Sequence, residues 1–290
     1  MIEAKQQGNS VIIEGIEDFD TDHVFDCGQC FRWNKEEDGS WTGTASGRSV
    51  NVSSADRMLR IENCSVADFN DFWYDYLDLS RDYAAIKSKI TDGDQVMEKA
   101  VAFGGGIRLL QQDPWETVIS FIISQNSNIP RIKKCIEGLC RLFGDPLGEY
   151  RGEERYAFPK PEQLAGLTRE DLAPVKLGYR DKYIIATADA VAADGGASLR
   201  AAENMPHDQA QKEIRKLKGV GPKVADCILL FGLHQYDSFP LDVWMKKIMS
   251  ALYGFEEDDT KGMTVYAREH YGNLSGFAQE YLYYYARFNL

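Results

Sequence analysis

The sequence predicts an α+β fold in which a small antiparallel sheet at the N-terminal end packs on a mostly α-helical C-terminal part. Alternating apolar and polar residues with glycine-containing turns dominate residues 11–61, and apolar residues recur at helical spacing after Pro114. The charge changes at the same place, because residues 1–113 carry a net charge of −10 and residues 114–290 a net charge of −2. We therefore expect two substructures, residues 1–113 and residues 114–290.

The predicted sheet consists of short alternating runs separated by turn-forming residues such as Gly39 and Gly47. Strands are expected at Val11–Ile13, Trp41–Thr44, Ser49–Val52 and Met58–Ile61. From about Val66 the apolar period lengthens, which predicts helices packed on the sheet or leading away from it.

The C-terminal part is expected to be almost wholly helical. The candidate helices are Trp115–Gln125, Ile129–Phe143, Pro161–Leu167, Asp171–Leu177, Asp181–Asp194, Asp208–Lys216, Pro222–Leu233, Val243–Tyr253 and Gly276–Phe288. The last of these is expected to be able to pack back on the N-terminal part. No internal repeat or low-complexity segment interrupts the pattern.

The composition is that of a globular protein, with 44% hydrophobic and 27% charged residues. Its net charge of −12 argues against a protein that coats nucleic acid through charge alone, although residues 211–250 carry a net +3 that would suit an anionic partner. No apolar run approaches the ~18 residues of a membrane span, so no membrane association is expected. Six cysteines are sparse for this length, which favours a reducing cytoplasm.

The most informative segment is Leu217–Cys227, in which Gly219, Val220 and Gly221 precede a helix that would begin at Pro222. Two glycines one residue apart permit a tight turn, and proline suits the first helical position, so we interpret the segment as a helix-hairpin-helix. The unpaired amides and the dipole of the second helix can bind a phosphate without net positive charge. An ordinary glycine-rich turn between packed helices is the alternative.

Two side chains near this hairpin suggest chemistry. Lys223 and Cys227 lie four residues apart and so face the same side of the helix. A lysine nucleophile must be neutral, so its pKa of roughly 10.4 would have to be lowered by burial or by a neighbouring cation. Asp242 directly precedes another helix, where a capping carboxylate stays ionised and could stabilise positive charge on a sugar. Lys223 could instead be a surface lysine near a phosphate, and Asp242 a simple cap.

Several motifs together resemble a known family. They are the hairpin Leu217–Cys227, then Pro240–Val243, the loop Cys27–Trp33, the junction Gln112–Glu116 with Ser124–Ile129, Leu177–Arg180, and Ala278-Gln279 with Tyr283. The hairpin is similar to that of the helix-hairpin-helix DNA glycosylase superfamily, and its lysine to that of the bifunctional glycosylase/lyases. The remaining motifs narrow the resemblance to the 8-oxoguanine DNA glycosylase family, along about nine-tenths of the chain.

The resemblance implies a base-excision-repair enzyme that flips a damaged base out of duplex DNA. Lys223 would attack the anomeric carbon, expel 8-oxoguanine and form a Schiff base, and β-elimination would then nick the strand; Asp242 would stabilise the cationic sugar. The implied partner is double-stranded DNA with 8-oxoguanine opposite cytosine. We expect a monomer in the cytoplasm of a prokaryote, associated with the nucleoid, with no required cofactor and no bound metal; the resemblance also allows a monovalent cation at the hairpin carbonyls.

The resemblance assigns four residues to the damaged base. The Gly28 carbonyl would test for the N7 proton that distinguishes 8-oxoguanine from guanine, and Gln279 would bond the Watson–Crick edge. Cys227 and Tyr283 would sandwich the ring. Without the resemblance, the tyrosine-rich stripe that includes Tyr283 would be interpreted as core packing.

The resemblance further assigns Asn126, Arg131, Tyr179 and Arg180 to the gap left by the flipped base and to the opposite cytosine, although solvated side chains would give the same pattern. Some residues depart from the family pattern. Ser127 stands where asparagine is common, Pro130 where a small residue is usual, Trp244 where histidine is frequent, and Tyr283 where phenylalanine is usual. These departures put fine specificity in doubt more than the reaction class.

Two other functions remain open from the sequence. An endonuclease III-like glycosylase for oxidised pyrimidines would often carry four cysteines after the catalytic domain, but no cysteine follows Cys227. Cys27 and Cys30 form a lone C-x-x-C without a second pair, so a zinc site is not expected. A non-catalytic helix-hairpin-helix DNA-binding protein is the alternative from another class, and the presence of Lys223 and Asp242 argues against it.

Overall fold

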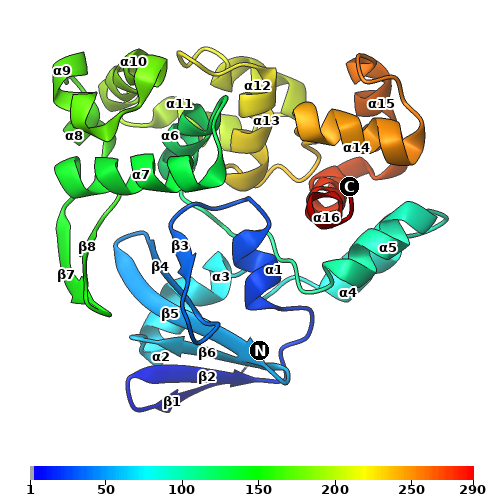
Figure 1. The fold of residues 1–290 in the computed structure, drawn as a ribbon, viewed down its shortest axis with the longest axis horizontal. Helices are drawn as coiled ribbons and strands as arrows, with labels where there is room; N and C mark the ends of the chain where they lie inside the picture. The colour runs from blue at the N-terminus through cyan, green and yellow to red at the C-terminus, as the bar shows by residue number, and fades with distance from the viewer. Residues whose placement is uncertain (1–2) are drawn as a thin grey trace.

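The computed structural model describes residues 3–290 and has an antiparallel sheet on one side of a helical assembly (Figure 1). The sheet order is β1-β2-β6-β5-β4-β3, with every neighbouring pair antiparallel. The strands are β1 (Ala4–Gln7), β2 (Ser10–Glu14), β3 (Trp33–Lys35), β4 (Trp41–Ala45), β5 (Arg48–Ala55) and β6 (Met58–Glu62). The predicted α+β class and the four predicted strands are therefore confirmed. The sequence pattern missed β1, which is polar and exposed, and β3, which has three residues.

One face of the sheet is buried under aromatic side chains. Trp33 stacks on Phe25 of α1 (Thr21–Asp26) with ring centroids 4.0 Å apart. A side chain at Gly43 on β4 would collide with the Trp33 ring, so the close packing there requires glycine. Helix α1 begins at its N-cap Asp20, whose carboxylate accepts hydrogen bonds from two backbone amides, and ends where the Cys27–Trp33 segment begins.

Helices follow the sheet, as the lengthened period predicts. They are α2 (Val66–Asp68), the π-helical turn η1 (Phe69–Trp73), α3 (Tyr74–Tyr76), α4 (Tyr83–Ile90) and α5 (Gln95–Phe103). Tyr83, Ile86 and Met97 of α4 and α5 are buried in the core of the helical part rather than under the sheet. Helix α16 (Ser275–Asn289) packs against α5, so the C-terminal helix does return to the N-terminal part. The division of the chain near residue 113 stays a prediction.

The remaining helices form the upper part of Figure 1. They are α6 (Pro114–Ser124), α7 (Ile129–Phe143), α8 (Pro161–Leu164), α9 (Arg169–Leu172), η2 (Ala173–Val175), η3 (Gly178–Arg180), α10 (Asp181–Ala193), α11 (Ala197–Glu203), α12 (His207–Ile214), α13 (Pro222–Phe231), α14 (Val243–Tyr253), α15 (Thr260–His270) and η4 (Gly272–Leu274). The bounds of α7 and α14 agree with the prediction residue for residue. Pro130 is accommodated because it lies in the first turn of α7, where no intrahelical N–H bond is lost.

The expectation of an almost wholly helical C-terminal part is wrong at one place. Strands β7 (Pro146–Tyr150) and β8 (Glu153–Tyr156) form a hairpin that descends from α7 beside the sheet (Figure 1). The hairpin is largely exposed and has no apolar face, so hydrophobic periodicity could not reveal it. At its turn Arg151 donates to Glu62 of β6 at 2.7 Å, which ties the hairpin to the sheet. No helix in residues 3–290 is long and apolar enough to cross a membrane.

Candidate active site

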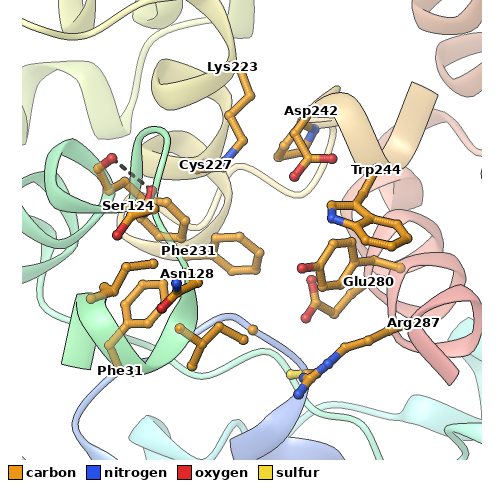
Figure 2. A pocket seen from close by; sticks show the side chains of 18 of the residues that line it. Phe31, Ser124, Asn128, Lys223, Cys227, Phe231, Asp242, Trp244, Glu280 and Arg287 are labelled. Carbon is orange, nitrogen blue, oxygen red and sulfur yellow. Dashed lines mark hydrogen bonds between the residues drawn. The ribbon is translucent and has the colours of Figure 1, made fainter. Parts of the chain in front are cut away.

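A cavity of about 440 Å³ lies where the Cys27–Phe31 loop meets α13, α14, α16 and the start of α7. The six residues that the sequence analysis assigned to catalysis or to the damaged base all line it, namely Gly28, Lys223, Cys227, Asp242, Gln279 and Tyr283. They come from three separate parts of the chain, at residue 28, residues 223–242 and residues 279–283, and the fold brings them to one place. Figure 2 labels three of them, Lys223, Cys227 and Asp242.

Lys223 enters the cavity from the first turn of α13. The helix begins at Pro222 with Gly221 as its N-cap, so Lys223 is the second helical residue. Its Nζ lies 5.6 Å from the centroid of the Phe121 ring, which itself stacks on Phe231. The amine therefore has an aromatic wall on one side, and Figure 2 shows it beside Cys227.

The electrostatic surroundings of Lys223 differ from the expectation of a lowered pKa. Burial lowers the pKa of the amine, but Cys227 and Asp242 act in the opposite direction, and the pKa is raised above 10.5. Burial raises the pKa of the Cys227 thiol to about 12, so this thiol is neutral at pH 7. With Cys227 uncharged at this pH, Asp242 is the anion that holds Lys223 as an ammonium in the resting protein, and the amine must lose a proton before it can act as a nucleophile.

Asp242 faces the cavity from the start of α14. One of its oxygens, Oδ1, accepts a hydrogen bond from the Met245 amide at 2.8 Å, as an N-cap should. Its carboxylate points into the cavity opposite Lys223 in Figure 2. Capping fixes the carboxylate while leaving its other oxygen for a cationic partner.

Gly28 lies in a loop that is held rigidly. Its φ of +103° is unfavourable for any other residue, and a Cβ there would lie 3.2 Å from Cε1 of Tyr283. The buried Gln29 side chain fixes the loop: its Nε2 donates to the carbonyls of Val24 at 2.9 Å and Arg108 at 2.7 Å, and its Oε1 accepts from the Leu110 amide at 2.8 Å. The loop therefore presents its backbone to the cavity in one conformation.

Helix α16 contributes one wall. Gln279 and Tyr283, four residues apart, face the cavity, whereas Tyr281 and Leu282 are fully buried in the core. The tyrosine-rich helix therefore serves both core packing and the cavity, because one of its faces packs in the core and another lines the cavity. The Gln279 Oε1 atom is buried without a hydrogen-bond partner in the described chain. Burial raises the pKa of the Tyr283 hydroxyl to about 12.

The four residues assigned to the opposite base lie together but do not line the cavity. Asn126 is exposed with φ +48° in the turn between α6 and α7. Tyr179 is 44% exposed and lies under the Arg180 guanidinium, with 4.6 Å between Cζ and the ring centroid. Arg131 is exposed, and its Nη2 lies 3.5 Å from the Lys176 carbonyl oxygen.

Arg180 differs from the solvated arginine that the sequence alone would suggest. It is 3% exposed, and its Nε and Nη2 both donate to the Gln125 carbonyl. Nη2 also donates to the Asn126 carbonyl at 2.9 Å, and Nη1 to Leu177 at 3.1 Å. Four of its five N–H donors are thus engaged with backbone, so in this state Arg180 holds the turn that carries Asn126.

The hairpin has the geometry that its glycines predict. Gly219 has φ +83°, and a Cβ there would lie 2.5 Å from the Tyr183 ring. The Gly219 carbonyl accepts a hydrogen bond from Gln125 Nε2 at 2.9 Å, which joins the hairpin to the α6–α7 turn. Val220 is buried, and the Gly221 N-cap offers no side-chain acceptor. The amides of Lys223 and Val224 in the first turn of α13 therefore remain suited to an anion.

Some cavity residues were not singled out from the sequence. Glu280, Arg287, Phe31, Phe121 and Phe231 all line it. A signal for Glu280 did exist, because it is the only acidic residue of α16 and lies on a strongly apolar stretch. The exposed Trp244, one of the departures from the family pattern, also lies at the cavity, with Lys247 Nζ 5.7 Å from its ring centroid.

Within residues 3–290, no three His, Cys, Asp or Glu side chains are grouped closely enough to hold a metal ion. Cys27 and Cys30 are buried free thiols. Three hairpin carbonyls each accept one hydrogen bond, that of Leu217 from the Val220 amide, that of Lys218 from Thr187 and that of Gly219 from Gln125. Each carbonyl keeps a second lone pair.

Comparisons with known proteins agree with this geometry. The family described as "8-oxoguanine DNA glycosylase, N-terminal domain" matches residues 11–118, and that described as "HhH-GPD superfamily base excision DNA repair protein" matches residues 119–272. The "Probable N-glycosylase/DNA lyase" of Methanothermobacter thermautotrophicus is 35% identical over 202 residues, which cover 63% of this chain and 64% of that protein, slightly less than two thirds of its length.

Two solved structures are similar along the whole chain. MBOgg1 in complex with a low affinity DNA ligand has a TM-score of 0.94 and 45% identity, covering 99% of this chain and 98% of that one. The 8-oxoguanine glycosylase/lyase of Clostridium acetobutylicum, in complex with dsDNA containing cytosine opposite 8-oxoG, has a TM-score of 0.93 and 42% identity, covering 100% and 98%.

Proposed function

Because the chain belongs to the 8-oxoguanine DNA glycosylase family of the helix-hairpin-helix base-excision-repair superfamily, we propose that it removes 8-oxoguanine from double-stranded DNA and then nicks the strand. The observation that carries this proposal is one cavity in which Lys223 and Asp242 face Gly28, Gln279 and Tyr283. A DNA-binding hairpin without catalysis would not need a half-buried lysine beside a fixed carboxylate, and no observation favours the alternative pyrimidine glycosylase.

The proposed reaction follows from the amine and the carboxylate. After losing a proton, Lys223 Nζ attacks C1′ of the flipped nucleotide, the bond from C1′ to the base breaks, and 8-oxoguanine leaves with the bonding electrons and takes up a proton. Asp242 stabilises the positive charge that develops on the sugar. Ring opening gives an imine between Lys223 and C1′. Loss of a C2′ proton then expels the 3′ phosphate, which nicks the strand.

The damaged base is proposed to occupy the cavity. The Gly28 carbonyl accepts from N7–H, which guanine lacks, and Gln279 bonds the Watson–Crick edge with the buried Oε1 that has no partner within the described residues. Cys227 and Tyr283 contact the two faces of the ring. These contacts reject guanine because its N7 would place an acceptor against the Gly28 carbonyl.

Duplex DNA is proposed to lie across the hairpin and the α6–α7 turn. The first-turn amides of α13 bind a backbone phosphate, Asn126 fills the gap left by the flipped base, and Arg131, Tyr179 and Arg180 contact the opposite cytosine. Support comes from the Gln125 side chain, whose hydrogen bond to the Gly219 carbonyl links the two elements. A monovalent cation at the hairpin carbonyls, a monomeric state and a cytoplasmic, nucleoid-associated location remain predictions.

Borohydride trapping tests the proposal, because it reduces an imine to a stable covalent adduct. The protein is incubated with duplex containing 8-oxoguanine opposite cytosine, and the adduct is measured on a denaturing gel. We expect trapping by the wild-type protein, and none by Lys223→Gln, which should still bind the lesion.

The matched control is Lys212→Gln, since Lys212 is an exposed lysine of α12 outside the cavity, and it should trap like the wild type. Absence of an adduct from folded wild-type protein would contradict the imine mechanism. An adduct with oxidised pyrimidine but not with 8-oxoguanine would favour the endonuclease III-like function instead.

A further inference from the structure

A buried carboxyl group in the cavity wall has no part in the reaction described above. Glu280 of α16 is 2% exposed and lines the cavity. Its Oε1 atom is buried without a hydrogen-bond partner in the described part of the chain. Figure 2 shows the carboxyl group directed at the open centre of the cavity. An unpaired polar atom in such a place costs free energy unless a ligand satisfies it.

The surroundings keep this carboxyl group neutral. Burial raises the pKa of Glu280 to about 8, while a hydrogen bond with Cys27 lowers it and the charge of Asp242 raises it. The other groups near it are Cys30 behind Cys27, Tyr283 on its own helix, and Lys223 and Cys227 across the cavity. At pH 7 Glu280 therefore presents an O–H donor and a carbonyl acceptor.

The nearest arginine does not neutralise Glu280 as an anion. Arg287 also lines the cavity, but its Nη1 donates to the Asp26 carbonyl at 2.5 Å and both its terminal nitrogens lie 3.3 Å from Asp26 Oδ1. The guanidinium is thus engaged with Asp26, the last residue of α1. An ionised Glu280 would be repelled by Asp242, and the neutral Cys27 thiol would offer it only a weak donor in compensation.

The position of Glu280 identifies the edge of the base that it meets. The Glu280 carboxyl group and the Cys27 thiol shift each other's pKa, so the carboxyl group lies beside the residue that precedes Gly28. The Gly28 carbonyl is proposed to accept from N7–H, and the atom next to N7 in 8-oxoguanine is the C8 carbonyl. An O–H donor beside Gly28 is therefore suited to the oxygen that oxidation adds.

We propose that Glu280 is a specificity-determining residue that, in its protonated form, donates a hydrogen bond to the C8 carbonyl oxygen of the flipped base. The inference rests on the proposed function, because it assumes that this cavity receives 8-oxoguanine. Together, Gly28 and Glu280 then provide an acceptor and a donor that match the N7–H and C8=O pair. Guanine offers neither member of the pair, so both contacts favour the damaged base.

The test compares two reactions of the same protein. Excision of 8-oxoguanine requires the base in the cavity, whereas nicking of a preformed abasic site requires Lys223 but no base. Single-turnover rates of both are measured between about pH 6 and pH 9.5 for wild type, Glu280→Gln, Glu280→Ala and the control Glu269→Gln, an exposed glutamate of α15. Glu280→Ala should lower the ratio of excision to nicking about tenfold or more. Glu269→Gln should not change it.

The pH profile separates this role from a structural one. Glutamine keeps an N–H donor at this position and cannot ionise. The excision rate of the wild type, divided by that of Glu280→Gln, should therefore fall about tenfold per pH unit above the pKa of about 8. The ionisation of the substrate cancels in this quotient because both proteins act on the same DNA.

A flat quotient across this range would overturn the proposal, and so would a Glu280→Ala variant that loses excision and nicking equally. If Glu280→Ala does not fold, the pH dependence of the wild-type excision rate divided by that of Glu280→Gln still tests the proposal. A wild-type protein that neither excises nor nicks would contradict the proposed function. In that case, equal affinity of wild type and Glu280→Gln for duplexes with 8-oxoguanine and with guanine at pH 7 and pH 9 would overturn the Glu280 inference separately.

Discussion

At the scale of single residues, the charge state of Lys223 decides when the reaction can begin. Burial lowers the pKa of its amine, but the negative charge of Asp242 opposes burial, so the amine is protonated at neutral pH. The rate of imine formation with abasic DNA should therefore rise with pH through the neutral range, as the neutral fraction of the amine grows.

Asp242→Asn tests the contribution of the carboxylate. Asparagine is also a good N-cap, so α14 should keep its start. Removing the negative charge lowers the pKa of Lys223, and the rise in imine formation should shift to lower pH. Excision of 8-oxoguanine should nevertheless fall, by about a hundredfold, because the sugar cation loses its stabilising charge. The measurement is the trapping rate on abasic DNA against pH, and a shift to higher pH would contradict the assignment.

The role of a single residue could be predicted from the sequence only where the residue lies at a recognisable position relative to a motif or to the start of a helix. Lys223 and Asp242 follow from the hairpin and from the start of a helix. The raised pKa of Lys223 did not follow, because it depends on Asp242, 19 residues away in sequence. The role of Gln29 in fixing the Gly28 loop could not be predicted either, since its partners Arg108 and Leu110 belong to a distant segment.

At the scale of elements, the α6–α7 turn joins the hairpin to the residues proposed to contact the opposite base. Arg180 holds this turn through the Gln125 and Asn126 carbonyls, and Gln125 holds the hairpin through Gly219. A direct contact between Arg180 and cytosine would require the guanidinium to leave some of these carbonyls. Arg131, by contrast, is exposed and can reach a base without rearrangement.

The two arginines should respond differently to alanine substitution. Arg180→Ala removes several buried hydrogen bonds and should lower the free energy of unfolding by roughly 2 kcal/mol, with weaker discrimination between cytosine and adenine opposite the lesion. Arg131→Ala should change stability by less than about 0.5 kcal/mol and weaken the same discrimination. The measurements are urea unfolding and excision rates with each opposite base. Unchanged discrimination in both variants would remove these residues from opposite-base recognition.

The elements that sequence reasoning located best are those with a strong apolar period or a clear start. Helices α7 and α14 begin after Asn128 and Asp242, both of which cap through their side chains. Helix α15 was missed because its cap, Asp259, ends the acidic run Glu256–Asp259, which looks like a solvated loop. The β7–β8 hairpin has neither an apolar face nor buried strands, so only its contact with the sheet defines it.

At the scale of the whole molecule, the net charge of −12 limits how tightly undamaged DNA is held. Most of the acidity belongs to residues 1–113, and the proposed phosphate contact uses helix amides, which add no formal charge. Affinity for undamaged duplex should therefore be modest, and it should fall about tenfold or more between roughly 50 and 200 mM salt.

A lesion should add affinity without adding salt dependence. The groups proposed to contact 8-oxoguanine, Gly28, Gln279 and neutral Glu280, carry no charge. Plots of log Kd against log salt for damaged and undamaged duplexes should then be parallel and displaced, as fluorescence anisotropy with Lys223→Gln can measure. Tight binding to undamaged duplex that does not respond to salt would contradict this distribution of contacts.

The sequence predicts which residues line the cavity better than it predicts the shape of the cavity. Six of its residues could be named from motifs, but its aromatic walls and Glu280 depend on how α16 packs between α5 and α14. Helical periodicity shows that α16 is buried without showing which of its faces meets open space.

The central claim is that one amine, that of Lys223, performs both bond-breaking steps. The most direct measurement is to digest the borohydride-reduced adduct formed with 8-oxoguanine DNA and to locate the modified residue by peptide mass spectrometry. The account predicts a single modified peptide that carries the sugar remnant on Lys223. A remnant on another lysine or on the N-terminal amine would contradict it.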